Sequence, residues 1–219
     1  MTHEDLKRLV LLGEGSRLEF KNRVPRPERI AREVIAFANT DGGTVLIGVD
    51  DDGTILGLRD AEEELFALSN ALRGRIAPEV EIAIAAVHVS RRRDVLVVRV
   101  PASADRPHGL VPEPGTTGDA ARPHAYVRVG DQSVEASRES VRVMRAETRG
   151  EGAAFTFGEP ERRLLEYLDR HERITVSEYA RMAEMPPWRA SKTLVALVRA
   201  GIVRLHAGPG GQDHFTAAG

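Results

Sequence analysis

The chain has 219 residues, with 31 basic and 33 acidic side chains and a formal net charge of -2. It contains no cysteine, which excludes disulfides and thiolate metal sites, and no apolar run approaches the roughly 20 residues that span a bilayer. We therefore expect a cytoplasmic protein without a membrane segment, in which binding of nucleic acid would depend on local basic patches.

Residues 1–150 predict an α+β domain with a mixed sheet. A helix is expected at 3–12, a strand at 17–21 and a helix from 27 to about 39, which has helical apolar spacing and a proline at its start. The strand alternates, so Leu18 and Phe20 are expected to face one way while Arg17, Glu19 and Lys21 face the other. This pattern predicts a charged surface on one side of the strand.

The next stretch, AFANTDGGTVLIGVDDDG, covers residues 36–53. It predicts a helix end, a glycine turn and a hairpin whose strands, TVLIGV and TILGL, are joined at an Asp-Gly step. The glycines do not resemble a phosphate-binding loop, because a helix precedes them, a strand follows them and no Lys-Ser or Lys-Thr completes the motif. Nucleotide binding therefore has no physical support in this segment.

The remainder of the first domain is read from apolar periodicity and from its prolines and glycines. The expected elements are a helix at 60–76, strands at 81–89 and 94–100, a long loop at 101–123, a strand at 124–130 and a helix at 136–149.

A linker at 151–158 and a small domain at 159–219 complete the predicted organisation. Three helices, with a Ser or Thr cap or a proline at their starts, precede two short strands around a glycine-rich turn. This order matches a winged helix-turn-helix. The sequence leaves open whether such a module contacts DNA or another protein, since winged helices do both.

Charge favours DNA over a protein partner. No acidic residue occurs between Glu184 and Asp213, and the same segment contains the basic residues Arg189, Lys192, Arg199 and Arg204. We expect Arg189, Ser191 and Lys192, in the first turns of the third helix, to enter the major groove. The remaining two arginines are expected to contribute to binding, with Arg204 contacting the backbone from the base of the wing.

Acidic residues of the first domain allow a second hypothesis. Glu14 and Glu19 lie five positions apart, and Asp50 and Asp51 belong to the hairpin turn. Together, these carboxylates could hold Mg²⁺ or Mn²⁺ and activate water against a phosphodiester. The alternative is that the aspartates only form a turn. The seven histidines are scattered without paired spacing and do not predict a zinc site.

Three motifs resemble those of the Schlafen-type, AlbA-like DNA-binding domain family: EGSRLEFK, AFANTDGGTVLIGVDDDGTILGL and AYVRVG. The resemblance covers roughly residues 10–145 and implies binding to nucleic acid, in bacterial proteins often joined to a winged helix. Some members are nucleases, which implies a metal-dependent RNase centre at Glu14, Glu19 and either Asp50 or Asp51. Those nucleases pair two such domains head to tail, so this single copy would need a homodimer.

Basic residues near the motifs are candidates for contacts with phosphate. Lys21 and Arg23 lie beside the acidic pair in the sequence, and Arg128 would join them if the sheet brings the strands together. The alternative is salt bridging with Glu14 and Glu19. We therefore expect a homodimeric DNA-binding protein that regulates transcription, with RNA as another possible ligand and a metal-dependent nuclease as the alternative function.

Overall fold

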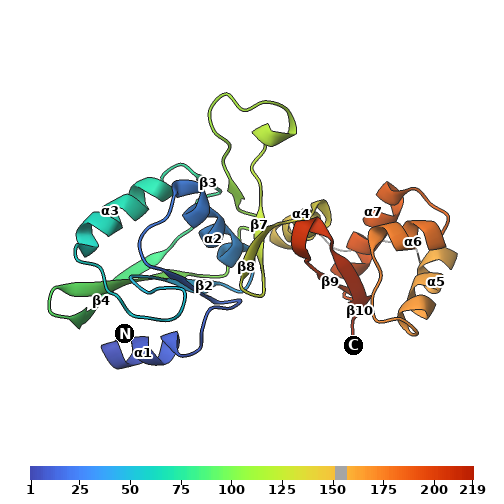
Figure 1. The fold of residues 1–219 in the computed structure, drawn as a ribbon. Coiled ribbons are helices and arrows are strands. Elements are labelled where there is room, and N and C mark those ends of the chain that lie inside the picture. Colours follow the sequence, from blue (N-terminus) through green and yellow to red (C-terminus); the bar gives the residue numbers. More distant parts are fainter. Residues whose placement is uncertain (151–156) are drawn as a thin grey trace. The chain divides into compact units, whose positions relative to one another are not determined.

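A computed structural model describes residues 1–150 and 157–219 (Figure 1). It divides into two compact units, Met1–Ser133 and Val134–Gly219, which we call the N-terminal and C-terminal units. None of the described helices combines the length and the apolar character that crossing a membrane requires.

The N-terminal unit is built on a mixed sheet of strands β1 (Leu18–Lys21), β2 (Gly43–Ile47), β4 (Ala83–Ser90) and β5 (Arg93–Val100). Their order is β1-β2-β5-β4. β1 is parallel to β2, whereas β5 is antiparallel to both of its neighbours. The α+β class and the mixed sheet expected from the sequence are confirmed.

Apolar side chains from both faces of this sheet are buried by helices. One face packs against α2 (Pro27–Asn39) and α3 (Ala61–Leu72), and the other against α1 (His3–Val10). Alternation along β2 divides its side chains between the two layers, since Val45 and Ile47 face α2 while Leu46 faces α1. α2 has the only nearly continuous run of buried residues among the three helices because β7 (Tyr126–Val129) also packs against it.

The hairpin expected after β2 is reduced to a turn. Val49 and Ile55 form an isolated bridge, and the predicted strand TILGL does not continue beyond it. Gly48 and Gly57 have φ values of +107° and +66°, which interrupt extended backbone on either side of that bridge.

The loop expected at 101–123 is not entirely irregular. It contains the two-residue strand β6 (Gly109–Leu110), which pairs with β3 (Ile76–Ala77).

The described part of the C-terminal unit contains four α-helices, α4 (Arg138–Thr148), α5 (Glu159–Leu168), α6 (Val176–Met182) and α7 (Pro187–Arg199). They precede an antiparallel pair, β9 (Val203–His206) and β10 (His214–Ala217). Leu164, Tyr179, Leu194 and Phe215 lie at the centre of its core. Strand β8 (Gln132–Glu135), which pairs with β7, crosses the boundary between the units.

The sequence predicts α4 as the last helix of the first domain, but this helix is bonded to residues of the C-terminal unit. Ser140 Oγ donates to Asp213 Oδ2 at 2.8 Å, and Arg142 Nη1 donates to Ser191 Oγ at 2.8 Å. The compact units accordingly separate between Ser133 and Val134 rather than near residue 150. Most of the predicted linker, residues 151–156, lies outside the described residues.

Candidate nucleic-acid interface

All four residues of β1 are buried, which corrects the expectation of a charged surface strand. Glu19 and Lys21 are 6% and 7% exposed, and Lys21 Nζ is bonded to Glu19 Oε1 and to the carbonyl oxygen of Phe20. Alternation places the two charged side chains on the same side of the strand, but α2 and β7 supply residues that cover this side. Lys21 is therefore an internal cation and is not presented to a phosphate backbone.

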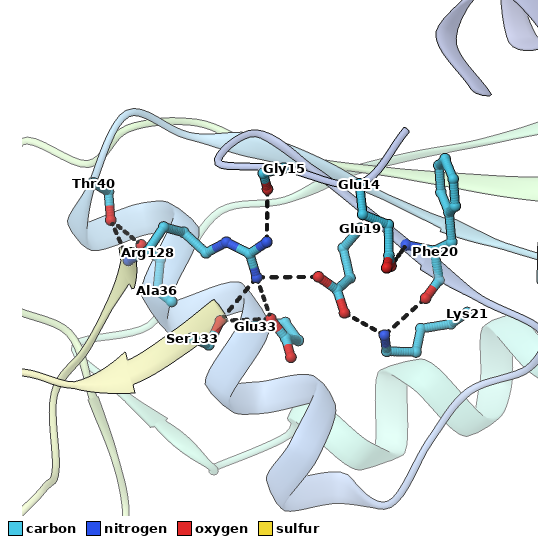
Figure 2. Close-up of polar contacts among 10 residues, drawn as sticks. All are labelled: Glu14, Gly15, Glu19, Phe20, Lys21, Glu33, Ala36, Thr40, Arg128 and Ser133. Atoms are coloured by element: carbon cyan, nitrogen blue, oxygen red, sulfur yellow. Dashed lines mark hydrogen bonds and ion pairs between the residues drawn. The ribbon is translucent and has the colours of Figure 1, made fainter. Parts of the chain in front are cut away.

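Arg128, from β7, is the centre of the same polar cluster (Figure 2). Its Nη1 donates to Glu19 Oε2 at 3.1 Å, to Glu33 Oε2 at 2.8 Å and to Ser133 Oγ at 3.1 Å, and its Nη2 donates to the carbonyl oxygen of Gly15 at 2.7 Å. The Arg128 side chain is 1% exposed. The expectation that Arg128 contacts phosphates is therefore corrected. Arg128 forms salt bridges with Glu19 and Glu33 instead.

The guanidinium group of Arg128 also lies over an aromatic ring. Its central carbon is 4.7 Å from the centroid of Phe37, within the range of a cation–π interaction. The Arg128 backbone N–H donates to Thr40 Oγ1 at 3.0 Å. The AFANT and YVRVG motifs therefore meet around one buried cation, which joins α2 to β7.

Glu33 has a perturbed ionisation in this cluster. Burial raises the pKa of its carboxyl group above the ordinary value of 4.5, and the nearby Glu19 carboxylate acts in the same direction. The hydrogen bond from Ser133 and the charges of Arg128 and Lys21 lower the pKa and oppose this shift. The proton affinity of Glu33 is therefore set by the burial of the cluster as well as by its ion pair.

Asn39 ties the end of α2 to two other segments. Its Nδ2 donates to the carbonyl oxygens of His108 and Tyr126, each at 2.9 Å, while its Oδ1 accepts from the His108 backbone N–H at 2.8 Å. Three hydrogen bonds satisfy this side chain, which is 3% exposed. The Asn of the AFANT motif therefore holds the end of α2 against the segments around His108 and Tyr126.

The carboxylates predicted to bind a metal are engaged elsewhere. Glu14 Oε1 accepts the backbone N–H of Phe20 at 2.7 Å, and Glu19 is held by Lys21 and Arg128. Asp50 and Asp51 lie in the turn after β2. Among the described residues, no three His, Cys, Asp or Glu side chains are gathered so that they could share a metal ion. In this arrangement, the predicted ligands do not fit Mg²⁺ or Mn²⁺.

The aspartate turn is stabilised by local hydrogen bonds. Asp52 Oδ1 accepts the backbone N–H of Thr54 at 2.8 Å, and Asp50 Oδ1 accepts that of Asp51 at 3.2 Å. Hydrogen bonds from Thr54 lower the pKa of Asp52 below its usual range. Gly53 follows with a φ of +84°, which a glycine adopts without strain. The segment functions as a turn in this structure.

The residues predicted to contact DNA in the C-terminal unit lie in three different environments. Arg189, Lys192 and Arg204 are exposed, as a DNA contact requires, whereas Arg199 is only partly exposed. Ser191 is 4% exposed and is bonded to Arg142 and Glu139 of α4. The expectation that Ser191 enters the major groove is therefore corrected, because α4 covers this side of α7.

In the N-terminal unit, Arg23 is the predicted phosphate contact whose side chain is exposed, whereas Lys21 and Arg128 are buried.

A basic groove of about 470 Å³ lies between α4 and α7. We call it the α4–α7 groove, and its cationic lining residues are Arg142, Arg145, Arg149, Lys192 and Arg199. Trp188, which is 67% exposed, also lines it. None of the described residues that form its lining is acidic. Five of the nine lining residues of this groove are therefore cationic.

A smaller basic hollow occurs at the start of α2 in the N-terminal unit. Arg26, Arg29 and Arg32 line it together with Glu28, Glu33 and Ser133, and it has a volume of about 450 Å³. The three arginines are exposed, but two carboxylates share the hollow with them. Its charge is therefore less one-sided than that of the α4–α7 groove.

Comparison with known proteins identifies the N-terminal unit. A family model described as Schlafen, AlbA_2 matches residues 14–137, which is more than half of the chain. The chain belongs to the Schlafen AlbA_2 family. The family predicted from the three motifs is thus confirmed, and membership in it suggests binding to nucleic acid. No match is found among curated proteins.

Two solved structures resemble part of this AlbA_2 protein. The DIP2311 protein of Corynebacterium diphtheriae is 20% identical with a TM-score of 0.41, and the match covers 66% of this chain and 32% of that one. The N-terminal domain of a RecG-related protein from Nitrosomonas europaea is 22% identical with a TM-score of 0.40, covering 60% of this chain and 92% of that one. The present chain thus corresponds to about a third of the first protein.

Sequence reasoning missed the arginines of α4 as members of a basic surface. Arg138, Arg142, Arg145 and Arg149 recur at intervals of four, three and four residues, which places them near one face of a helix. This spacing was a usable signal. Because the helix was assigned to the first domain, its basic face was not connected with Lys192 of α7.

Proposed function

We propose that this Schlafen AlbA_2 protein binds DNA through its C-terminal unit and regulates transcription. The observation that carries the proposal is the exposure of Arg189, Lys192 and Arg204 on a segment free of acidic residues between Glu184 and Asp213. Exposed guanidinium and ammonium groups displace counterions from phosphates and supply the sequence-independent part of DNA affinity.

The arrangement of the C-terminal unit supports a winged helix-turn-helix as the binding module. α6 and α7 are joined by a short turn, and β9 and β10 form a hairpin after them. Backbone hydrogen bonds of 2.9 and 2.8 Å link Ile174, before α6, with Phe215 of β10. In such modules, the second helix of the pair enters the major groove and the hairpin lies along the backbone. α7 and Arg204 would take these roles.

A pair of arginine variants tests duplex binding. Arg189→Gln combined with Arg204→Gln is expected to weaken binding of the full chain to duplex DNA about tenfold or more at low salt. Arg163→Gln combined with Arg170→Gln removes the same charge from exposed positions and serves as the matched control. Equal affinities for the two double variants, measured by fluorescence anisotropy, would contradict the assigned DNA surface.

Homodimerisation is part of the proposal because a single small module makes few base contacts, and two half-sites raise the effective concentration. Sedimentation velocity of the full chain, alone and with a two-half-site duplex, is expected to show two chains per duplex.

A genome-wide crosslinking map tests the proposed role in regulation, since a transcriptional regulator is expected to bind at promoters. Cleavage of nucleic acid that depends on Mn²⁺ and is abolished by EDTA would instead support the nuclease hypothesis.

A further inference from the structure

The α4–α7 groove combines cationic walls with an exposed aromatic side chain. Its walls carry five cationic side chains, and Trp188 stands beside them with 67% of its surface exposed. The exposed indole of Trp188 offers a flat apolar face beside the cationic side chains, on which a planar ligand could stack. An unpaired nucleobase presents its whole face to an aromatic side chain, whereas in a duplex its neighbours in the stack cover that face.

We propose that the α4–α7 groove binds an unpaired nucleic-acid strand, with phosphates on Arg145 and Lys192 and a base stacked on Trp188. This inference rests on the proposed function and adds the form of nucleic acid and the place where it binds. Single-strand sites characteristically combine a basic channel for the backbone with aromatic platforms for the bases. A volume of about 470 Å³ is in the range of small-ligand sites, which suits a nucleotide-sized part of a flexible strand.

Local packing holds the groove in shape. Ser191 of α7 accepts a hydrogen bond from Arg142 Nη1 at 2.8 Å and donates to Glu139, so the two walls are fixed to each other. The Glu139 carboxylate accepts the hydrogen bond from Ser191. Arg145 and Lys192 are exposed on opposite walls. A preformed basic channel lowers the cost of ordering side chains around the strand.

Trp188 provides a direct measurement, because it is the only tryptophan in the chain. Its emission in the full-length protein is expected to be quenched when single-stranded oligothymidylate or oligouridylate is added at low salt. A DNA duplex of the same length is expected to bind without comparable quenching. The DNA and RNA arms distinguish which single strand is preferred.

Two variants test the groove independently of fluorescence. Trp188→Ala is expected to weaken binding of a labelled single strand about tenfold, as measured by anisotropy, because stacking contributes that much per base. Arg145→Gln is expected to weaken single-strand binding and to reduce its salt dependence by about one unit of slope. Arg170→Gln, exposed and outside the groove, is the charge control, and Phe66→Ala, 68% exposed on α3, is the aromatic control.

The outcomes separate this inference from the proposed function. Duplex binding that requires Arg189 and Arg204, together with single-strand binding that neither quenches Trp188 nor weakens in Trp188→Ala, would overturn the groove site alone. Absence of binding to any DNA or RNA at low salt would overturn both. Quenching by single strands that is lost at high salt, with weaker binding in both groove variants, would support the groove site.

Discussion

Arg128 and Lys21 are the two buried cations of the N-terminal unit that face Glu19 and Glu33. Burying such charges is costly, and the cost is recovered only when each charge has partners. Arg128 provides four side-chain hydrogen bonds, which satisfy both carboxylates and the carbonyl oxygen of Gly15. At the scale of single residues, these motif positions stabilise the fold.

Removing the central cation is expected to destabilise the fold strongly. Arg128→Met leaves Glu19 and Glu33 buried without their shared partner, so the free energy of unfolding should fall by about 3 to 5 kcal/mol. Urea denaturation of the full chain measures the change. Arg59→Gln, at an exposed position, is the control and should change stability by less than about 0.5 kcal/mol. A loss below about 1 kcal/mol for Arg128→Met would show that the cluster is not stabilising.

The raised pKa of Glu33 predicts a pH dependence with a definite sign. A carboxyl group with a higher pKa in the folded chain binds more protons when folded, so its stabilising contribution is complete at low pH. This contribution declines as pH rises from the ordinary value of 4.5 through the raised pKa. Glu33→Gln removes the titration, so the unfolding free energy of the parent chain minus that of the variant should decrease with rising pH.

Denaturation at several pH values between about 4.5 and 7 provides this measurement. Glu79→Gln, at an exposed position, is the matched control. An unfolding free energy of the parent chain that rises with pH relative to that of Glu33→Gln would mean that the ion pair with Arg128 outweighs burial, and would contradict the assigned direction of the pKa shift.

At the scale of elements, the turn between α2 and β2 depends on close approach of backbone segments. Gly42 has a φ of +72°, and a Cβ atom there would lie 2.8 Å from both the nitrogen of Ala102 and the oxygen of Val100. At Gly43, a Cβ would lie 2.3 Å from the ring of Phe37. The two glycines therefore allow the chain to turn tightly between the core of α2 and the end of β5.

Two alanine variants separate this steric effect from backbone strain. Gly42→Ala and Gly74→Ala both place a side chain at positive φ, but Gly74 has no atom within 4 Å of the added Cβ. Gly42→Ala is therefore expected to lower the unfolding free energy by about 1 to 3 kcal/mol more than Gly74→Ala. Thermal and urea denaturation check this, and equal losses would show that the turn adjusts without cost.

The pairing of α4 with α7 gives a second prediction at this scale. Ser191→Ala removes the hydroxyl group that joins Arg142 to Glu139, and should lower the unfolding free energy by about 1 to 3 kcal/mol while leaving duplex affinity unchanged. Lys192→Gln, at the next position and exposed, should show the opposite pattern. Weaker duplex binding by Ser191→Ala at unchanged stability would restore Ser191 as a DNA contact.

At the scale of the whole molecule, the net charge of -2 means that a polyanion is attracted by local surfaces only. We expect duplex affinity to fall steeply with salt, because released counterions supply much of the binding free energy. The slope of log K against log salt should decrease in magnitude by about one for each of Arg189 and Arg204 changed to Gln. Titrations at several salt concentrations measure it, and an unchanged slope would place the phosphate contacts elsewhere.

Much of this molecule could be predicted from local patterns. The α+β class, the order of most elements and the family are present in apolar spacing, in glycine and proline positions and in three motifs. Exposure of Arg189, Lys192 and Arg204 also agrees with expectation. The roles of Lys21, Arg128 and Ser191 were not predictable in the same way, because each depends on an element distant in the sequence.

That Glu19 and Lys21 share one side of β1 follows from the sequence alone, since alternation is a property of the extended backbone. What covers that side depends on the folded chain, because the covering Arg128 is 109 positions from Glu19. The helical spacing of the α4 arginines was likewise a local property, but their meeting with Trp188 and Lys192 required α4 to pack on α7. A cationic side chain forms an internal ion pair when a distant segment packs over it, and it stays available to a polyanion when no segment covers it. Local periodicity does not indicate which distant segment will pack there.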